Sequence, residues 1–217
     1  MQEPFVGDWA PESHLSSAAL RSLHDLNHRF LDLAASGRIA RCAFLTAQIA
    51  PLSAAHRESL AHCPYALFDL NFADDAHWQI CLHAGQGWGV ADDESADREI
   101  ASFVHVALFY AWHVAAGASL AAQLLLGMNP QTARAFRRST VNMLPALAAS
   151  EAPALAARWG QCTAYWNALT SAALRCESAP LRRAQLSGLQ LAAAARLPVH
   201  QGGSWSELPL RAGPRAV

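Results

Sequence analysis

The stretch of residues 16–36, SSAALRSLHDLNHRFLDLAAS, decides the fold class. Its apolar residues recur at steps of three and four, which is the period of one face of an α-helix. Ser16 and Ser17 can cap the start of this helix, because a serine oxygen accepts hydrogen bonds from the free amides of a first turn. Gly37 stands where a left-handed residue commonly ends a helix. The stretch therefore predicts an amphipathic helix whose buried face is formed by Leu20, Leu23, Leu26, Phe30, Leu33 and Ala34.

The rest of the chain shows the same combination of helical periodicity with cap and stop residues. Ser53 can cap one helix, Asp74 or Asp75 can cap the next, and Asn129 followed by Pro130 is a typical helix start. We predict an all-α fold, a compact bundle of about eight to ten helices. The further predicted helices span residues 41–49, 53–62, 74–83, 95–116, 119–126, 130–138, 140–149, 153–176 and 180–197.

Residues 65–72 (YALFDLNF) are a segment that also fits a short strand. A single strand has no ladder partner, so we expect a loop or a short helix there. Residues 1–197 are expected to form a single helical domain, although the chain could divide near 85–97, where several glycines are followed by acidic residues. Residues 198–217 carry glycines and prolines with little periodicity, which predicts a flexible tail.

A long uncharged stretch, residues 100–133, contains no Asp, Glu, Lys or Arg. It is long enough to cross a bilayer. His105, His113 and Gln123 interrupt it, however, and much of its apolar content is alanine. We therefore expect a buried core helix and no membrane contact.

The cysteines and the first residues indicate the compartment. The five cysteines are scattered and never spaced as CxxC, so we expect reduced thiols rather than a disulfide framework. The first residues carry acidic side chains and no basic cluster followed by an apolar run, which is unlike a signal peptide. Both features favour a cytoplasmic protein.

Charge is divided unequally along the chain. Residues 1–128 hold six arginines and 14 acidic residues, whereas residues 129–217 hold ten arginines and three acidic residues. Such asymmetry favours a nucleic acid or another anionic partner, because the guanidinium fork matches phosphate and carboxylate oxygens. The alternative is an internal dipole without function, or attraction between the two copies of a dimer. The candidate nucleic-acid contacts are Arg134, Arg137, Arg138, Arg182 and Arg183.

No motif in the chain fixes a reaction, and we predict no catalytic residue, cofactor or metal. His24 and His28 stand one helical turn apart but flank the apolar stripe, as a solvated helix edge does. In a second group, His77 and Cys81 share a helix face, whereas His83 falls elsewhere on the helix. Whether this group binds a metal stays open. An enzyme or small-ligand binder would need an aromatic pocket, for which the candidates are Trp88, Trp112, Trp159, Trp166 and Trp205.

Two short segments resemble the D subunit of the bacterial flagellar master transcription regulator. Residues 23–27 (LHDLN), followed by Phe30-Leu31 and Leu33-Ala34, are similar to the first helix of that family. Residues 126–129 (LGMN) are similar to its leucine-glycine-aliphatic-asparagine segment, and the similarity continues through Ala133, Phe136, Thr140 and Leu147-Ala148. The resemblance implies a small helical protein that dimerises, joins a partner subunit and activates promoters.

The sequence thus leads us to expect a helical regulatory protein that binds DNA or an acidic protein partner through its arginine-rich second half. The helices over 16–36 and 95–116 are apolar on more than one face, which predicts a homodimer. Two alternatives stay open. One is a helical adaptor without nucleic-acid contact, and the other is a small-ligand-binding protein or an enzyme with an aromatic pocket.

Overall fold

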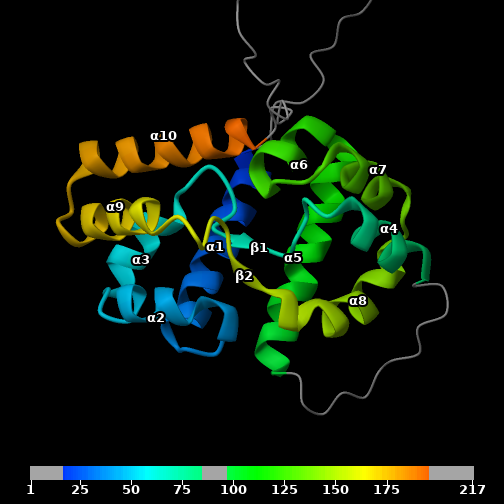
Figure 1. Cartoon of the computed structure of the whole chain (residues 1–217), viewed down its shortest axis with the longest axis horizontal. Coiled ribbons are helices and arrows are strands. Elements are labelled where there is room, and N and C mark those ends of the chain that lie inside the picture. Colours follow the sequence, from blue (N-terminus) through cyan, green and yellow to red (C-terminus); the bar gives the residue numbers. More distant parts are fainter. Residues whose placement is uncertain (1–16, 85–96, 196–217) are drawn as a thin grey trace, which may run out of the picture.

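The computed structural model describes residues 17–84 and 97–195 and shows a mainly helical fold (Figure 1). Helices make up 76% of the described residues, which confirms the all-α prediction. The α-helices of this part of the chain are α1 (Ser17–Ala35), α2 (Ala43–Ile49), α3 (Ala54–Ala61), α4 (Asp75–Ala84), α5 (Arg98–Gly117), α6 (Ser119–Leu126), α7 (Pro130–Arg138), α8 (Leu144–Glu151), α9 (Thr163–Leu174) and α10 (Ser178–Ala194). Three short 3-10 helices join them, at Ala40–Cys42, Val141–Met143 and Ala152–Ala154.

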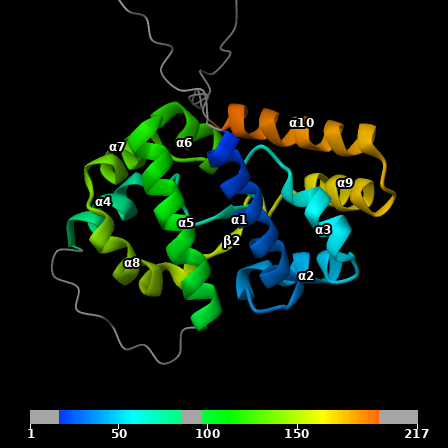
Figure 2. The ribbon, with the colours of Figure 1, turned by 180° about the vertical axis from the view of Figure 1, so that it is seen from behind.

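Helices α1 and α5 lie side by side through the middle of the molecule (Figure 2). Helices α2, α3, α9 and α10 extend from α1 at one end, while α4, α7 and α8 lie beyond α5 at the other. One buried apolar cluster includes residues from α1 through α10, on both sides of the segment 85–96. The predicted apolar stripe of α1 belongs to this cluster, with Leu20 partly buried at its edge.

The helix starts follow the cap residues. The Ser53 side chain accepts from the amide of His56, and the Asp74 carboxylate accepts from the amide of His77. The Asn129 side chain accepts from the amide of Gln131 at the start of α7. These bonds satisfy amides that have no partner inside their own helix, which is why the cap residues place the helix starts.

The predicted helix over 153–176 is wrong in its first part. Residues 152–154 form a 3-10 helix, β2 (Ala156–Ala157) follows, and α9 begins only at Thr163. The strand β2 pairs antiparallel with β1 (Phe68–Asp69), so the expectation that residues 65–72 lack a ladder partner is also wrong. Both differences arise from contacts between segments that are distant in the sequence. The amide of Arg158 donates to the carbonyl of Leu67, and Trp159 turns the chain with a φ of 53°.

Smaller differences concern other predicted starts, and α10 begins at Ser178 rather than at residue 180. Asp97 caps α5 directly, so this helix begins at Arg98 rather than Ser95. Thr140 precedes a 3-10 helix and α8 without a side-chain cap bond. The glycines and most acidic residues of the segment 85–97, and the predicted flexible tail 198–217, lie outside the described residues.

Among the described helices, α5 is the one whose length and composition would suffice to cross a membrane. Half of that apolar window is buried inside the fold. The buried part faces the shared core, as expected, but His105 and His113 lie on the exposed face of α5 rather than in the core.

Candidate functional site

The five candidate arginines are all exposed, and they fall into two separate groups. Arg134, Arg137 and Arg138 lie on α7. Arg182 and Arg183 lie near the start of α10, which Figure 1 places beside α9 at the opposite end of the molecule from α7. The fold therefore does not bring all five onto one face.

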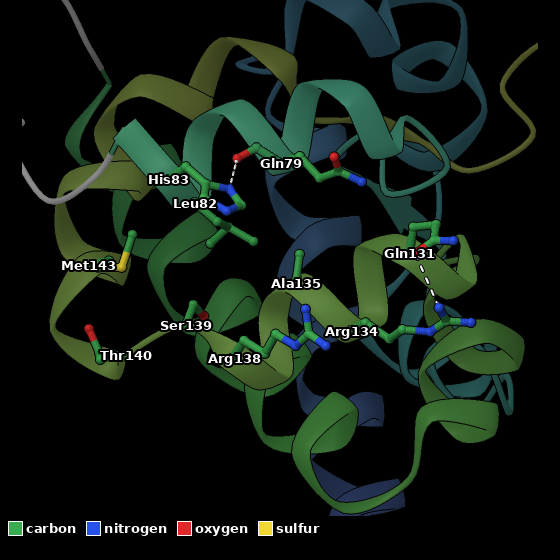
Figure 3. Close-up of a pocket in the computed structure, with 10 residues that line it drawn as sticks. All are labelled: Gln79, Leu82, His83, Gln131, Arg134, Ala135, Arg138, Ser139, Thr140 and Met143. Atoms are coloured by element: carbon green, nitrogen blue, oxygen red, sulfur yellow. Dashed lines mark hydrogen bonds between the residues drawn. The ribbon is translucent and has the colours of Figure 1, made fainter.

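A cavity of about 480 Å³ lies between α4 and α7 (Figure 3). Arg134 and Arg138, four residues apart on α7, form one of its walls. Gln79 and His83 of α4 form another. We call this cavity the arginine pocket, and its complete lining is Gln79, Leu82, His83, Gln131, Arg134, Ala135, Arg138, Ser139, Thr140 and Met143.

The arginine pocket is rich in hydrogen-bond donors. The Arg134 guanidinium donates to the Gln131 side chain at 3.3 Å, which leaves most of its N–H groups available. The Nδ1 atom of His83 lies 2.6 Å from the carbonyl oxygen of Gln79, so Nδ1 carries the proton and Nε2 is left for another partner. No acidic side chain stands among the described residues that line the pocket. Its chemistry is suited to an anion.

The arginines of α7 and α10 are not neutralised by the acidic first half of the chain, as far as the described residues extend. In that half, Arg57 pairs with Asp32, and Arg38 pairs with Asp97 and Glu99. Within the described residues, none of the five candidate arginines forms an ion pair.

Arg158 shows the opposite behaviour, because it is 5% exposed and serves the fold. Its guanidinium donates to the carbonyl oxygen of Leu125 at 2.7 Å at the end of α6 and lies over the ring of Trp159. A cation there satisfies free carbonyls and the negative end of the helix dipole. Burial lowers the pKa of Arg158 to about 10, and the nearby Asp69 opposes that shift. This positive charge is held within the fold, where it borders a cavity of about 680 Å³ between α6 and α10.

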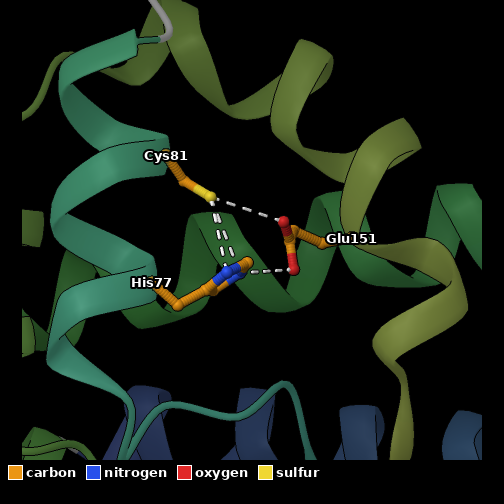
Figure 4. Close-up of side chains that lie close together, drawn as sticks. All are labelled: His77, Cys81 and Glu151. Carbon is orange, nitrogen blue, oxygen red and sulfur yellow. Dashed lines mark hydrogen bonds and ion pairs between the residues drawn. The ribbon is translucent and has the colours of Figure 1, made fainter.

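A second cluster lies on another side of α4 and consists of His77, Cys81 and Glu151 (Figure 4). Glu151, the last residue of α8, is buried, and its carboxylate oxygens lie 3.0 Å from Nε2 of His77 and 3.6 Å from the Sγ atom of Cys81. The Sγ atom lies 3.5 Å from the same Nε2. Burial, followed by the Glu151 charge, raises the pKa of the Cys81 thiol to about 11.

The sequence predicts the shared face of His77 and Cys81 but not the third member of this cluster. His83, which the sequence groups with them, lines the arginine pocket instead. Glu151 is distant in sequence and becomes a neighbour only through the packing of the fold. One signal could have found it, because Glu151 is the only acidic residue between Glu99 and Glu177.

His24 and His28 line a separate cavity of about 390 Å³, together with Asp25, Glu58 and His62. His28 pairs with Asp32 on the surface of α1, and the His24 ring packs against the His62 ring. Trp159 and Trp166 belong to an aromatic group around Tyr165. Trp112 lies elsewhere on α5 and donates to the Ser139 carbonyl, so the described tryptophans do not line one pocket. Trp88 and Trp205 lie outside the described residues.

The residues that carry the flagellar-regulator resemblance include two with clear structural roles. The buried Asn27 side chain donates to the carbonyl oxygens of Ala61 and Tyr65 and accepts from the amide of Leu67. Gly127 ends α6 with a φ of 74°, a conformation that glycine adopts without strain. The structural roles of Asn27 and Gly127 account for these two residues without any functional role.

Comparison of the chain with models of known protein families, with curated proteins and with solved structures found no match. A functional proposal for this chain therefore depends on its own residues and their geometry.

Proposed function

We propose that this protein is a helical regulatory protein that binds nucleic acid through the phosphate backbone, with the arginine pocket as the contact. The observation that carries the proposal is the pairing of Arg134 and Arg138 along one wall of a cavity that acidic side chains do not line within the described residues. Two guanidinium groups one helical turn apart can engage neighbouring phosphate oxygens. The regulatory role follows the resemblance to the flagellar regulator subunit.

The polar neighbours of the two arginines support this proposal. Gln79, Gln131 and Thr140 add neutral donors to the same cavity, and His83 adds a ring nitrogen. Contacts of this kind position a protein on a nucleic acid without reading its sequence. We therefore expect binding that depends strongly on salt and weakly on base sequence.

The experiment is a fluorescence-anisotropy titration of a labelled DNA duplex with the full chain at a series of salt concentrations. We expect the affinity to fall steeply as salt rises, because each neutralised phosphate contributes about −0.9 to the logarithmic slope. A polyglutamate peptide measured in parallel distinguishes an acidic protein partner. Absence of duplex binding at low salt would overturn the proposal, and binding of the peptide alone would favour the acidic partner.

The exposed face of α5 favours a second candidate, a helical adaptor without nucleic-acid contact. This face carries Val106, 42% exposed, and Phe109, 48% exposed, with His105 and His113 beside them and no charged residue from Ile100 onward. The same face of α5 could also bind a second copy of the chain. The apolar residues of α1 are buried in the core, so α5 is the better surface for the proposed homodimer. Light scattering that gives the mass of one chain at micromolar concentration would contradict the homodimer.

A further inference from the structure

The His77–Cys81–Glu151 cluster joins three different metal-ligating side chains from two helices. His77 and Cys81 lie one turn apart on α4, and Glu151 reaches them from the end of α8 (Figure 4). One ligand atom from each residue lies within 4.8 Å of the other two. Imidazole, thiolate and carboxylate are all ligands of Zn²⁺, and a thiolate disfavours Mg²⁺ and Ca²⁺.

The pairwise separations in the cluster are close to those around a tetrahedral zinc ion, although Sγ and Nε2 each face a different oxygen of the Glu151 carboxylate. With ordinary Zn–S, Zn–N and Zn–O bond lengths, sulfur lies about 3.6 Å from a nitrogen or oxygen ligand, and nitrogen lies about 3.3 Å from oxygen. In the structure, Sγ of Cys81 lies 3.5 Å from Nε2 of His77 and 3.6 Å from Oε1 of Glu151. Nε2 lies 3.0 Å from Oε2. Rotation of the Glu151 carboxylate and of the His77 ring would bring one ligand atom from each residue around one ion.

The same geometry argues against a cysteine nucleophile with a histidine base. In such a triad, one ring nitrogen faces the nucleophile and the opposite nitrogen faces the carboxylate. Here both the carboxylate and the thiol lie closest to Nε2, with Nδ1 farther from Sγ at 3.9 Å. Sγ lies at similar distances from both ring nitrogens, so the ring does not present one nitrogen to the thiol and the opposite nitrogen to the carboxylate.

The buried carboxylate of Glu151 is a second feature that a bound cation would suit. The Glu151 side chain is 6% exposed, and its described hydrogen-bond partners are His77 and Cys81, with no arginine among them. A buried carboxylate requires a compensating charge or hydrogen bonds. A divalent ion would balance the carboxylate together with a Cys81 thiolate. The His77 side chain is 37% exposed, which gives an ion a route from solvent.

We propose that His77, Cys81 and Glu151 form a Zn²⁺ site with a fourth coordination position open to water or another ligand. The ion would fasten α4 to the end of α8. Because α4 also forms a wall of the arginine pocket, zinc would hold that wall in place. The inference does not depend on nucleic-acid binding, since it stands on a different group of side chains.

The test uses the full chain, first treated with a chelator and a reductant. Zinc is then titrated by calorimetry, and Co²⁺ is added separately because a cobalt–thiolate bond absorbs light through charge transfer. We expect one ion per chain and a cobalt–thiolate band. Cys81→Ser should abolish the band, and His77→Gln should weaken zinc binding by more than about 100-fold, since even losing a partner outside the ligand shell costs about 10–100-fold.

Matched controls separate this site from incidental binding. Cys176→Ser removes the exposed cysteine, and His83→Gln removes a histidine of the same helix outside the cluster. Both variants should bind zinc as the wild type does. No binding by the wild type would overturn the proposal, and so would equal binding by Cys81→Ser and His77→Gln. Circular dichroism of both variants verifies folding, and the partly exposed His77 is the safer position if Cys81→Ser unfolds.

Discussion

The two ends of the molecule both carry exposed arginines on a helix, but their surroundings differ. At the α7 end, Arg134 and Arg138 line a cavity with polar side chains from α4. At the α10 end, the side chains of Arg182 and Arg183 have no hydrogen bond or ion pair among the described residues. The two ends thus place equal charge in unequal surroundings, and we expect stronger binding at the α7 end, where donors line one cavity.

Arg158 extends this comparison to the interior. The sequence counts it with the other basic residues of the second half, yet its guanidinium is hydrogen bonded to the end of α6. A net charge summed over a segment thus combines arginines that stabilise the fold with arginines that can contact a partner. Burial and hydrogen-bond partners separate the two kinds.

The largest expected effect is the loss of the buried arginine. Arg158→Ala should lower the free energy of unfolding by about 3–5 kcal/mol, because it leaves the carbonyls of α6 and the nearby Asp69 without their cation. Arg183→Ala, a matched change at an exposed position, should alter it by less than about 0.5 kcal/mol. Urea unfolding followed by circular dichroism measures both. Similar changes in the free energy of unfolding for the two variants would contradict the distinction between the buried Arg158 and the exposed arginines.

A smaller loss should follow from a change that disturbs only the α10 end. Gly188 of α10 packs so closely against Tyr65 that an added Cβ would overlap the tyrosine oxygen. That oxygen also donates to the carbonyl of Gln185 on α10. Gly188→Ala should lower the free energy of unfolding by about 1–3 kcal/mol through overpacking.

The matched control is Gly117→Ala, where nothing lies within 4 Å of the added Cβ. This variant should be neutral or slightly stabilised. We expect Gly188→Ala to leave the affinity for DNA unchanged. If its binding free energy fell by as much as its free energy of unfolding, the α10 end would contribute to DNA binding, and the contrast between the two ends would be wrong.

The smallest expected effect concerns pH. Burial first, and then repulsion from His62, lowers the pKa of His24 below its ordinary value of 6.5, with Asp25 opposing. The folded chain therefore binds fewer protons here than the unfolded chain does. This contribution to stability is present above pH 6.5 and is lost as the pH falls below it. When the pH is lowered, the melting temperature of His24→Gln should fall less than that of the wild type. An equal fall in both proteins would show that protonation of His24 does not cause the loss of stability.

The local parts of the fold could be predicted from sequence, because caps and periodicity act within a few residues. Ser53 and Asn129 place their helix starts in this way. The start of α9 could not be predicted in this way. Leu155 and Trp159 show a helical spacing in the sequence, but the amide of Arg158 bonds to the carbonyl of Leu67, so this segment is not helical. Contacts between distant segments overrode the periodicity there.

The candidate sites divide in the same way. The spacing of His77 and Cys81 on α4, and of Arg134 and Arg138 on α7, follows from the helical repeat. Glu151 and His83 joined them only when α8 and α7 packed against α4. A helix predicts which of its own residues share a face, but not which other helix supplies the remaining members of a site.

The central claim is that the arginine pocket, rather than overall charge, binds the phosphate backbone. The most direct measurement compares the salt dependence of duplex affinity for two double variants that each remove two positive charges. Arg134→Ala with Arg138→Ala should flatten the logarithmic slope by about two, one for each lost phosphate contact. Arg182→Ala with Arg183→Ala should leave the slope at the wild-type value. Equal slopes for the two double variants, both folded by circular dichroism, would contradict the claim.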